Sequence, residues 1–187
     1  MLLSHKTALR QQLFARRKAL DVTMRQQYSA QIMAQASVYL QQQQAESVLL
    51  YRSIASEVVT TAWHEAGAVP WRVYAPVCNE GHEMTWFDAH SSTWQAADHG
   101  LFEPTGGAPW QAGENDWLLC PLLGFNRQGH RIGMGKGYFD RWLAAHRSSI
   151  RGCLGLAFSC QEVADLPVEA HDEPLDGIIT EKGFIRV

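Results

Sequence analysis

Residues 121–143, PLLGFNRQGHRIGMGKGYFDRWL, carry the strongest structural signal in the chain. The stretch begins as an apolar run, passes through a glycine-dense segment and ends in an amphipathic pattern typical of a helix. Four glycines stand within nine residues, namely Gly129, Gly133, Gly135 and Gly137. Average glycine usage of roughly 7% predicts fewer than one. A strand, a glycine loop and a helix in this order predict an α/β unit whose loop backbone can approach a ligand closely.

The same loop carries two bases, Arg131 and Lys136. Fixed positive charge, a flexible backbone and a following helix N-terminus together favour a polyanion, most often a phosphate chain. The loop is not a Walker A motif, because Lys136 is followed by Gly137. It is not the dinucleotide fingerprint either, because Gly133, Gly135 and Gly137 are spaced two and two.

Strands alternate with helical stretches around this loop. We expect helices at residues 4–20, from a Thr23–Gln26 capping box to about residue 44, between Thr60 and Gly67, and at residues 138–146. We expect strands at residues 47–51, 72–76, 84–87, 117–123 and 153–158, with a small β element at 178–187. Residues 88–116 read as an irregular excursion that Trp94 and Trp110 pin to the core. The order predicts one domain, residues 1–187, with a three-layer α/β fold: a largely parallel, Rossmann-like open sheet with helices on both faces.

Charged residues at two places outside the loop, the pair Lys6 and Arg10 and the single residue Glu57, are candidates for the same site. Lys6 and Arg10 are four residues apart on a helix, so their side chains lie one above the other. They form either a solvated basic face or a clamp for a phosphate group. Glu57 follows the first strand, at the edge of a parallel sheet where ligands gather, and is either a pocket residue or a surface carboxylate.

Carboxylates suited to Mg²⁺ occur in two places. Asp140, at the start of the helix after the loop, can cap that helix or hold a magnesium ion that bridges phosphates. A late acidic cluster is either a surface loop or a completion of the metal site by His171 and Asp172 or by Asp176. The cluster consists of Glu169, His171, Asp172, Glu173 and Asp176.

Composition limits the function classes. A net charge of −3 does not support a general nucleic-acid binder, so any anion site is local. No apolar run approaches the ~18 residues of a membrane span, and the N-terminus lacks the order of a secretory signal, so we expect a cytoplasmic protein. The four cysteines form no C-x-x-C pair, which argues against structural zinc and disulfides. Cys120 and Cys153 lie in apolar runs and are expected in the core.

The segment GFNRQGHRIGMGKGYFDRWL, residues 124–143, resembles the 5-formyltetrahydrofolate cyclo-ligase family. That family carries a stretch of the form G-F-D-x-x-G-x-R-L-G-x-G-x-G-Y-Y-D-R. Its K-x-x-x-R matches Lys6 and Arg10, and its E-x-x-T matches Glu57 and Thr60. Its P-x-E-x-H-D followed by D-x-I-I-T matches residues 167–180, so the resemblance covers nearly the whole chain.

The resemblance implies an ATP- and Mg²⁺-dependent conversion of 5-formyltetrahydrofolate to 5,10-methenyltetrahydrofolate in one-carbon metabolism. It implies a reduced folate as substrate, no nucleic-acid or membrane partner, and a monomer. The implied catalytic residues are Arg131 and Lys136, and the implied metal ligands are Asp140 and Asp172. The implied ATP contacts are Lys6, Arg10, Arg131, Ile132, Gly133, Met134, Gly135, Lys136, Gly137, Tyr138 and Phe139. The implied folate contacts are Ile54, Glu57, Met134, Gly135, Lys136, Gly137 and Tyr138.

Three positions depart from the family pattern. Asn126 stands where aspartate is common, Phe139 where a second tyrosine is common, and Val59 where a carboxylate often follows the residue matching Glu57. Val59 favours an alternative, a folate- or nucleotide-binding module without turnover. A sugar-phosphate or coenzyme A enzyme on a similar scaffold is a third interpretation, since fold alone does not fix function.

Overall fold

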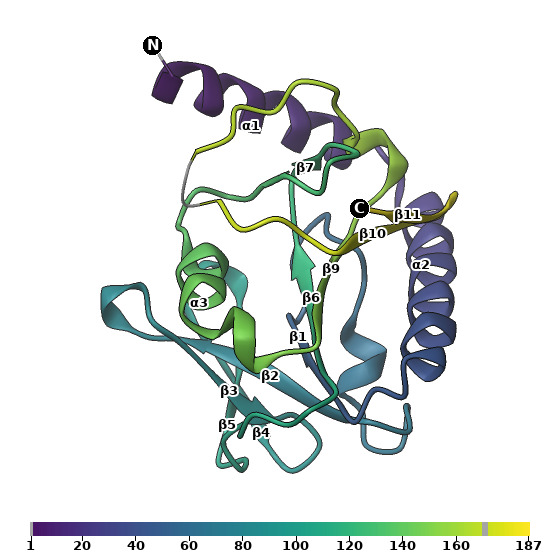
Figure 1. The fold of residues 1–187 in the computed structure, drawn as a ribbon, viewed down its shortest axis with the longest axis vertical. Helices are drawn as coiled ribbons and strands as arrows, with labels where there is room; N and C mark the ends of the chain where they lie inside the picture. Colours follow the sequence, from purple (N-terminus) through teal and green to yellow (C-terminus); the bar gives the residue numbers. More distant parts are fainter. Residues whose placement is uncertain (1, 170–171) are drawn as a thin grey trace.

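A seven-stranded sheet forms the centre of the computed structural model, which describes residues 2–169 and 172–187 (Figure 1). Its order is β11–β10–β9–β6–β1–β2–β3. The strands are β1 (Ser47–Leu50), β2 (Arg72–Cys78), β3 (Met84–Asp88), β6 (Asp116–Pro121), β9 (Gly152–Leu156), β10 (Gly177–Thr180) and β11 (Gly183–Arg186). The five inner strands pair in parallel, and the edge strands β3 and β11 pair antiparallel. The largely parallel sheet predicted from the sequence is confirmed.

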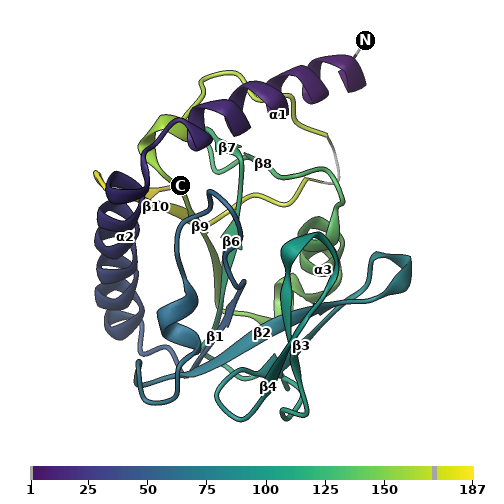
Figure 2. The same cartoon turned by 180° about the vertical axis from the view of Figure 1, so that it is seen from behind.

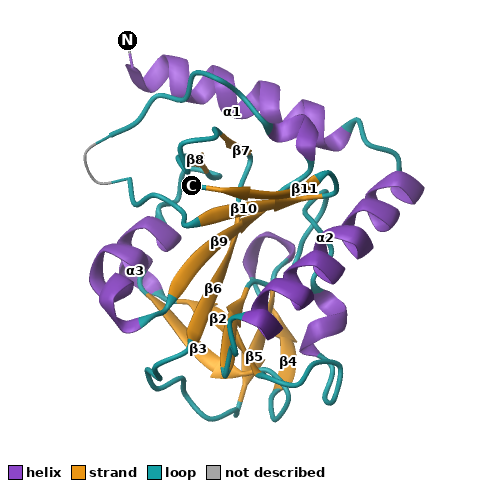
Figure 3. Cartoon of the chain, turned by 45° about the vertical axis from the view of Figure 1, so that its right-hand side comes forward, coloured by secondary structure: helices purple, strands orange, loops and turns teal. Residues whose placement is uncertain are grey.

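Helices cover both faces of the sheet (Figures 1 and 3). They are α1 (Leu2–Lys18), α2 (Val22–Gln42) and α3 (Tyr138–His146). Side chains of β1 alternate between the two faces, as a strand requires. Val48 and Leu50 pack in the cluster that contains Ile32 of α2, whereas Leu49 packs in the cluster that contains Leu143 of α3. The three-layer prediction is therefore confirmed.

Three local predictions were wrong. Residues 88–116 contain a hairpin of β4 (Thr93–Ala96) and β5 (Phe102–Thr105), whose strands are mostly exposed or half-buried and so lack a clear apolar alternation. The helix expected between Thr60 and Gly67 is one 3₁₀ turn, η1 (Thr61–His64). Asp21 caps α2 by accepting from the Met24 N–H, so the capping box at Thr23 does not form. The remaining short 3₁₀ segments are η2 (Glu80–His82), η3 (Asp98–Gly100), η4 (Arg147–Ser149) and η5 (Ser159–Gln161).

The chain reverses direction across the sheet between β1 and β6. From β1 it continues to β2 on one side, and from β6 it continues to β9 on the other. Open α/β sheets bind ligands outside the carboxyl ends of the strands at such a switch point. Helix α1 lies across this edge, where its Leu13 packs against Leu123 and Ile132 (Figures 1 and 2). Within the described ranges, no helix is long and apolar enough to cross a membrane.

Candidate active site

The glycine segment leaves β6 and forms a small hairpin of β7 (Gly124–Phe125) and β8 (Arg131–Ile132). Asn126 closes the turn between them. Its Oδ1 accepts hydrogen bonds from the backbone N–H groups of Gln128 (3.1 Å) and His130 (3.0 Å). An amide oxygen supplies the same acceptor as the aspartate expected here, so this departure preserves the turn.

The loop from residue 133 to 137 uses its glycines in two ways. Gly135 and Gly137 have φ of 92° and 72°, a left-handed conformation that favours glycine. Gly137 is the N-cap residue that directly precedes α3. Gly133 lies outside that region, and a Cβ added there would meet no atom within 4 Å. The fold does not require glycine at position 133, so the free space beside it suits a closely approaching ligand.

Two cations of α1 reach this loop and the late acidic segment that runs beside the helix (Figure 1). Arg10 Nε donates to the Gly133 carbonyl at 3.1 Å. Lys6 Nζ lies 2.7 Å from Glu169 Oε2 and 3.4 Å from Asp172 Oδ2. Because the Lys6 side chain is 8% exposed, the solvated basic face is wrong for this residue.

Arg131 pairs with one of the two predicted metal ligands, Asp140, and bonds to the backbone beside the other. Its buried guanidinium donates from Nη1 to the Glu173 carbonyl at 2.6 Å and from Nη2 to Asp140 Oδ1. The charge of Asp172 also acts on it. Helix α3 has no side-chain cap, so the capping alternative for Asp140 is wrong, and its carboxylate pairs with Arg131 instead.

The donor set fits Mg²⁺ bound mainly through phosphates. Over residues 2–169 and 172–187, no group of three or more His, Cys, Asp or Glu side chains could hold a metal. Mg²⁺ usually takes one or two carboxylates and completes its shell with phosphate oxygens and water, which Asp140 and Asp172 satisfy. The location of Asp176 favours Asp172 as the second ligand. It precedes β10 at the opposite edge of the sheet, where its carboxylate accepts from Arg147 and from the Cys153 N–H, each at 2.6 Å. His171 lies outside the described residues.

The remaining predicted ATP contacts differ in exposure. Lys136 and Met134 are exposed on the loop. The side chain of Ile132 packs in the core with Leu13, and the Phe139 ring lies 6.2 Å from that of Trp86. These two side chains contribute to packing, so an ATP contact at either position stays a prediction.

Tyr138 points toward the tip of the β2–β3 hairpin, which reaches the α3 side of the molecule (Figure 2). Its hydroxyl donates to the Asn79 carbonyl at 3.5 Å, and its ring lies 5.4 Å from that of His82. These contacts place Tyr138 beside this hairpin, and its predicted contact with folate stays a prediction.

The segment after β1 buries Glu57, which is 8% exposed, so the surface-carboxylate alternative is wrong. Its Oε2 accepts from the Ile54 N–H at 3.0 Å, and its own N–H donates to the Ile54 carbonyl. Burial raises the pKa of Glu57, whereas the Ile54 N–H and the charge of Arg17 oppose that rise. Val59 is 39% exposed, and its N–H donates to Ser29 of α2.

Arg17 is a charged residue of this region that sequence reasoning missed. It is buried near the end of α1 and donates to Ser56 and to the Leu122 carbonyl, each at 3.1 Å. The signal was present in the spacing, because Lys6, Arg10, Leu13 and Arg17 follow the i, i+4, i+7, i+11 pattern of one helix face.

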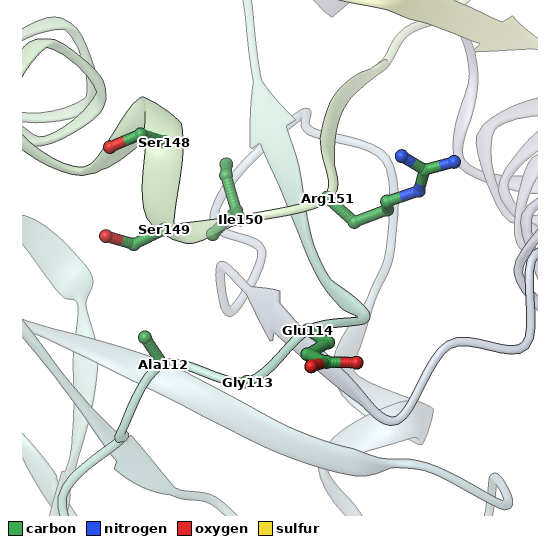
Figure 4. A pocket seen from close by; sticks show the side chains of 7 residues that line it. All are labelled: Ala112, Gly113, Glu114, Ser148, Ser149, Ile150 and Arg151. Atoms are coloured by element: carbon green, nitrogen blue, oxygen red, sulfur yellow. The ribbon is translucent and has the colours of Figure 1, made fainter.

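Two open surface hollows lie away from these residues. The larger, about 510 Å³, is at the amino-terminal edge of the sheet, where Glu114 precedes β6 and Arg151 precedes β9 (Figure 4). The smaller, about 310 Å³, is lined by residues around β11 and η5. Neither hollow is lined by a predicted site residue. The sheet topology and the paired charges, and not a hollow, therefore indicate the position of the active site.

An open α/β sheet with bases and carboxylates gathered at its switch point is typical of enzymes that handle phosphates. The chain matches the model of the 5-formyltetrahydrofolate cyclo-ligase family over residues 3–181, and it belongs to that family.

Individual relatives agree with this membership. A 5-formyltetrahydrofolate cyclo-ligase from Haemophilus influenzae is 31% identical, over 85% of this chain and 89% of the relative. The solved 5,10-methenyltetrahydrofolate synthetase of Aquifex aeolicus has a TM-score of 0.78 and 26% identity, covering 97% of this chain and 92% of that one. The Mycoplasma pneumoniae synthetase has a TM-score of 0.73 at 24% identity, covering 94% and 98%, and shows the shared fold.

Proposed function

We propose that this chain uses ATP and Mg²⁺ to convert 5-formyltetrahydrofolate to 5,10-methenyltetrahydrofolate, with release of ADP and phosphate, at the carboxyl edge of its sheet. One observation carries the location: two ion pairs, Lys6 with Asp172 and Arg131 with Asp140, lie beside the glycine loop, and the charge of Asp172 acts on Arg131. Family membership supports the reaction.

The chemistry requires activation of the formyl group. A formamide carbon is a poor electrophile, because the nitrogen donates into the carbonyl. Transfer of the γ-phosphoryl group to the formyl oxygen gives an iminium phosphate. The N10 amine then attacks the formyl carbon, the ring closes, and phosphate leaves with the former formyl oxygen. Enzymes assist such a transfer mainly by positioning the reactants and by stabilising charge.

The residues of this site would divide that work. Arg131 and Lys136 would stabilise the negative charge of the transferring phosphoryl group, and Lys6 and Arg10 would hold the ATP phosphates. Asp140 and Asp172 would hold Mg²⁺, which supplies further charge neutralisation when bound. The glycine backbone would let ATP and the formyl oxygen approach each other, while Ile54 and Glu57 would form the pterin side of the pocket.

Purified protein given 5-formyltetrahydrofolate, ATP and Mg²⁺ should gain the near-ultraviolet absorbance of the methenyl product, and omission of ATP should abolish the gain. No gain above background at high enzyme concentration would refute the activity. Tight folate binding without ATP consumption, measured by isothermal titration, would instead support the binding module that Val59 favours.

We further propose a monomeric, cytoplasmic enzyme, and size-exclusion chromatography with light scattering tests the monomer.

A further inference from the structure

Arg17 is a buried cation in the last turn of α1. Its neighbours Arg16 and Lys18 are exposed, whereas Arg17 is 3% exposed. Burial lowers the pKa of Arg17, and the charge of Glu57 opposes that fall. A buried charge is costly unless it is paired and hydrogen-bonded, so the partners of Arg17 indicate what it does.

Those partners come from both sides of the switch point. Arg17 Nε donates to Ser56 Oγ in the segment that leaves β1. Arg17 Nη1 donates to the Leu122 carbonyl, in the segment that leaves β6 and leads to the glycine loop. That carbonyl also accepts from Gln161 Nε2 at 2.8 Å. One guanidinium therefore ties together the two segments between which a ligand of this fold binds.

Arg17 also sets the electrostatic surroundings of Glu57, which directly follows Ser56. It is the cation whose charge lowers the pKa of Glu57 against the effect of burial. The other titratable groups that face Arg17 are Tyr51, Cys160 and Arg25. Burial raises the pKa values of Tyr51 and Cys160 above their ordinary alkaline values, so neither competes with Glu57 for the positive charge near neutral pH. An ionised carboxylate only accepts hydrogen bonds, which is what the N–H groups of a reduced pterin need.

We propose that Arg17 is a positioning residue for the folate side of the site: it fixes the Ser56–Glu57 segment against the Leu122 carbonyl and so holds Glu57 in place for the pterin. The inference rests on the proposed cyclo-ligase function and adds a residue that touches neither substrate. Lys6 lies eleven residues earlier on the same helix, roughly 16 Å away along its axis. Loss of Arg17 should therefore affect folate more than ATP.

The test measures the two ligands separately in the wild-type protein and in Arg17→Met, Arg17→Lys and Arg16→Met. Equilibrium dissociation constants for 5-formyltetrahydrofolate without ATP, and for ATP without folate, come from isothermal titration. Steady-state KM values follow between pH 5 and 8, and thermal melting checks that each variant is folded. Arg16→Met removes an exposed charge from the same helical turn and serves as the matched control.

We expect Arg17→Met to weaken folate binding about tenfold or more, as loss of hydrogen bonds to a charged group predicts, with ATP binding changed less than about twofold. The rise of folate KM at low pH should move to higher pH, because Glu57 loses the cation that favours its charged form. Arg17→Lys should recover part of the folate affinity, and Arg16→Met should match wild type. Equal losses for both ligands, or no loss of folate binding, would overturn the proposal.

Two further outcomes are distinguishable. If Arg17→Met does not fold, Ser56→Ala removes one acceptor of Arg17 and keeps its bond to the Leu122 carbonyl, and it should weaken folate binding in the same selective way. Unchanged folate binding in that variant would overturn the proposal. If the wild-type protein neither binds nor converts 5-formyltetrahydrofolate, the proposed function itself has failed.

Discussion

Gly129 and Gly133 lie four residues apart in the glycine segment, and the structure predicts opposite consequences for changing each to alanine. Gly129 has φ of 82°, and a Cβ there would lie 2.7 Å from the Leu175 carbonyl oxygen and 2.9 Å from Val187 Cγ1. Gly133 has an ordinary backbone conformation and open space where its Cβ would be. We expect Gly129→Ala to damage the fold and Gly133→Ala to damage ligand binding.

The magnitudes follow from these contacts. A left-handed alanine costs about 1–2 kcal/mol, and forcing a methyl group against a backbone oxygen costs about 1–3 kcal/mol. Gly129→Ala should therefore lower the free energy of unfolding by roughly 2–5 kcal/mol. Gly133→Ala should change it by less than about 1 kcal/mol, with a tendency to increase it, because alanine restricts the unfolded chain. A methyl group in space used by a phosphate should weaken ATP binding by roughly tenfold or more.

Urea denaturation followed by circular dichroism measures the stability of both variants, and isothermal titration with ATP and Mg²⁺ measures binding. The two variants control for each other, since each introduces the same methyl group into the same segment. If Gly133→Ala bound ATP like wild type, the open space beside residue 133 would not belong to the nucleotide site. If Gly129→Ala were as stable as wild type, the close approach of the Leu175 carbonyl would be relieved by a small backbone shift.

Further predictions follow from the charged groups. Lys136→Ala should fold normally, because Lys136 is exposed. It should lose most turnover, because Lys136 is a proposed catalytic residue. Arg131→Ala should lose turnover and also stability, because it leaves Asp140 and the Glu173 carbonyl without their donor; melting and steady-state assays separate the two cases. Asp140→Asn should strengthen the binding of Mg²⁺-free ATP, since Arg131 loses a competing anion, and should weaken the binding of the Mg²⁺–ATP complex. Titration of ATP with and without Mg²⁺ measures both affinities, and a fall in both would contradict the prediction. Burial lowers the pKa of His64 to about 4. The folded protein holds His64 neutral, so above pH 6.5 His64 carries no charge in either state and the stability is at its full value. As the pH falls from 6.5 toward 4 the unfolded state takes up the proton first, and at most about 3 kcal/mol of the free energy of unfolding is lost. Denaturation of His64→Gln should show a shallower acid dependence, and an unchanged slope would contradict the assignment.

The parts of the fold that sequence predicted well are those fixed by local pattern. Helix α3 begins and ends at the predicted residues, 138 and 146, because its apolar spacing and the preceding glycine define both faces and the start. The buried inner strands were also found, within a few residues at each end. The β4–β5 hairpin was not, because its strands are held partly by contacts between Thr93 and Thr105 and present no continuous buried face.

The site was predicted less completely, because its residues meet only in the folded chain. Lys6 and Asp172 are 166 residues apart, and sequence resemblance, not spacing, paired them. The pairing of Asp140 with Arg131 depended on where the β7–β8 hairpin places Arg131. The segment that buries Glu57 is bonded to Arg17 of α1 and to Ser29 of α2, both distant in sequence. Each of these is a property of tertiary packing that no local pattern contains.

Helix α1 explains why a basic face was ambiguous in the sequence. The face that it turns toward the sheet carries Lys6, Arg10 and Arg17, with Leu13 as its fully buried apolar anchor. Such a face resembles a solvated surface in sequence, yet two of its cations are buried and bonded to segments that leave the sheet. The helix is held by ion pairs, by hydrogen bonds to neutral groups and by apolar packing. A ligand that binds to the docked helix and not to the undocked one must stabilise docking through mass action. In the proposed site, Lys6 lies on the phosphate side and Arg17 on the folate side. Binding at either end therefore favours the same docked position, so the two substrates of the proposed reaction can assist each other without touching.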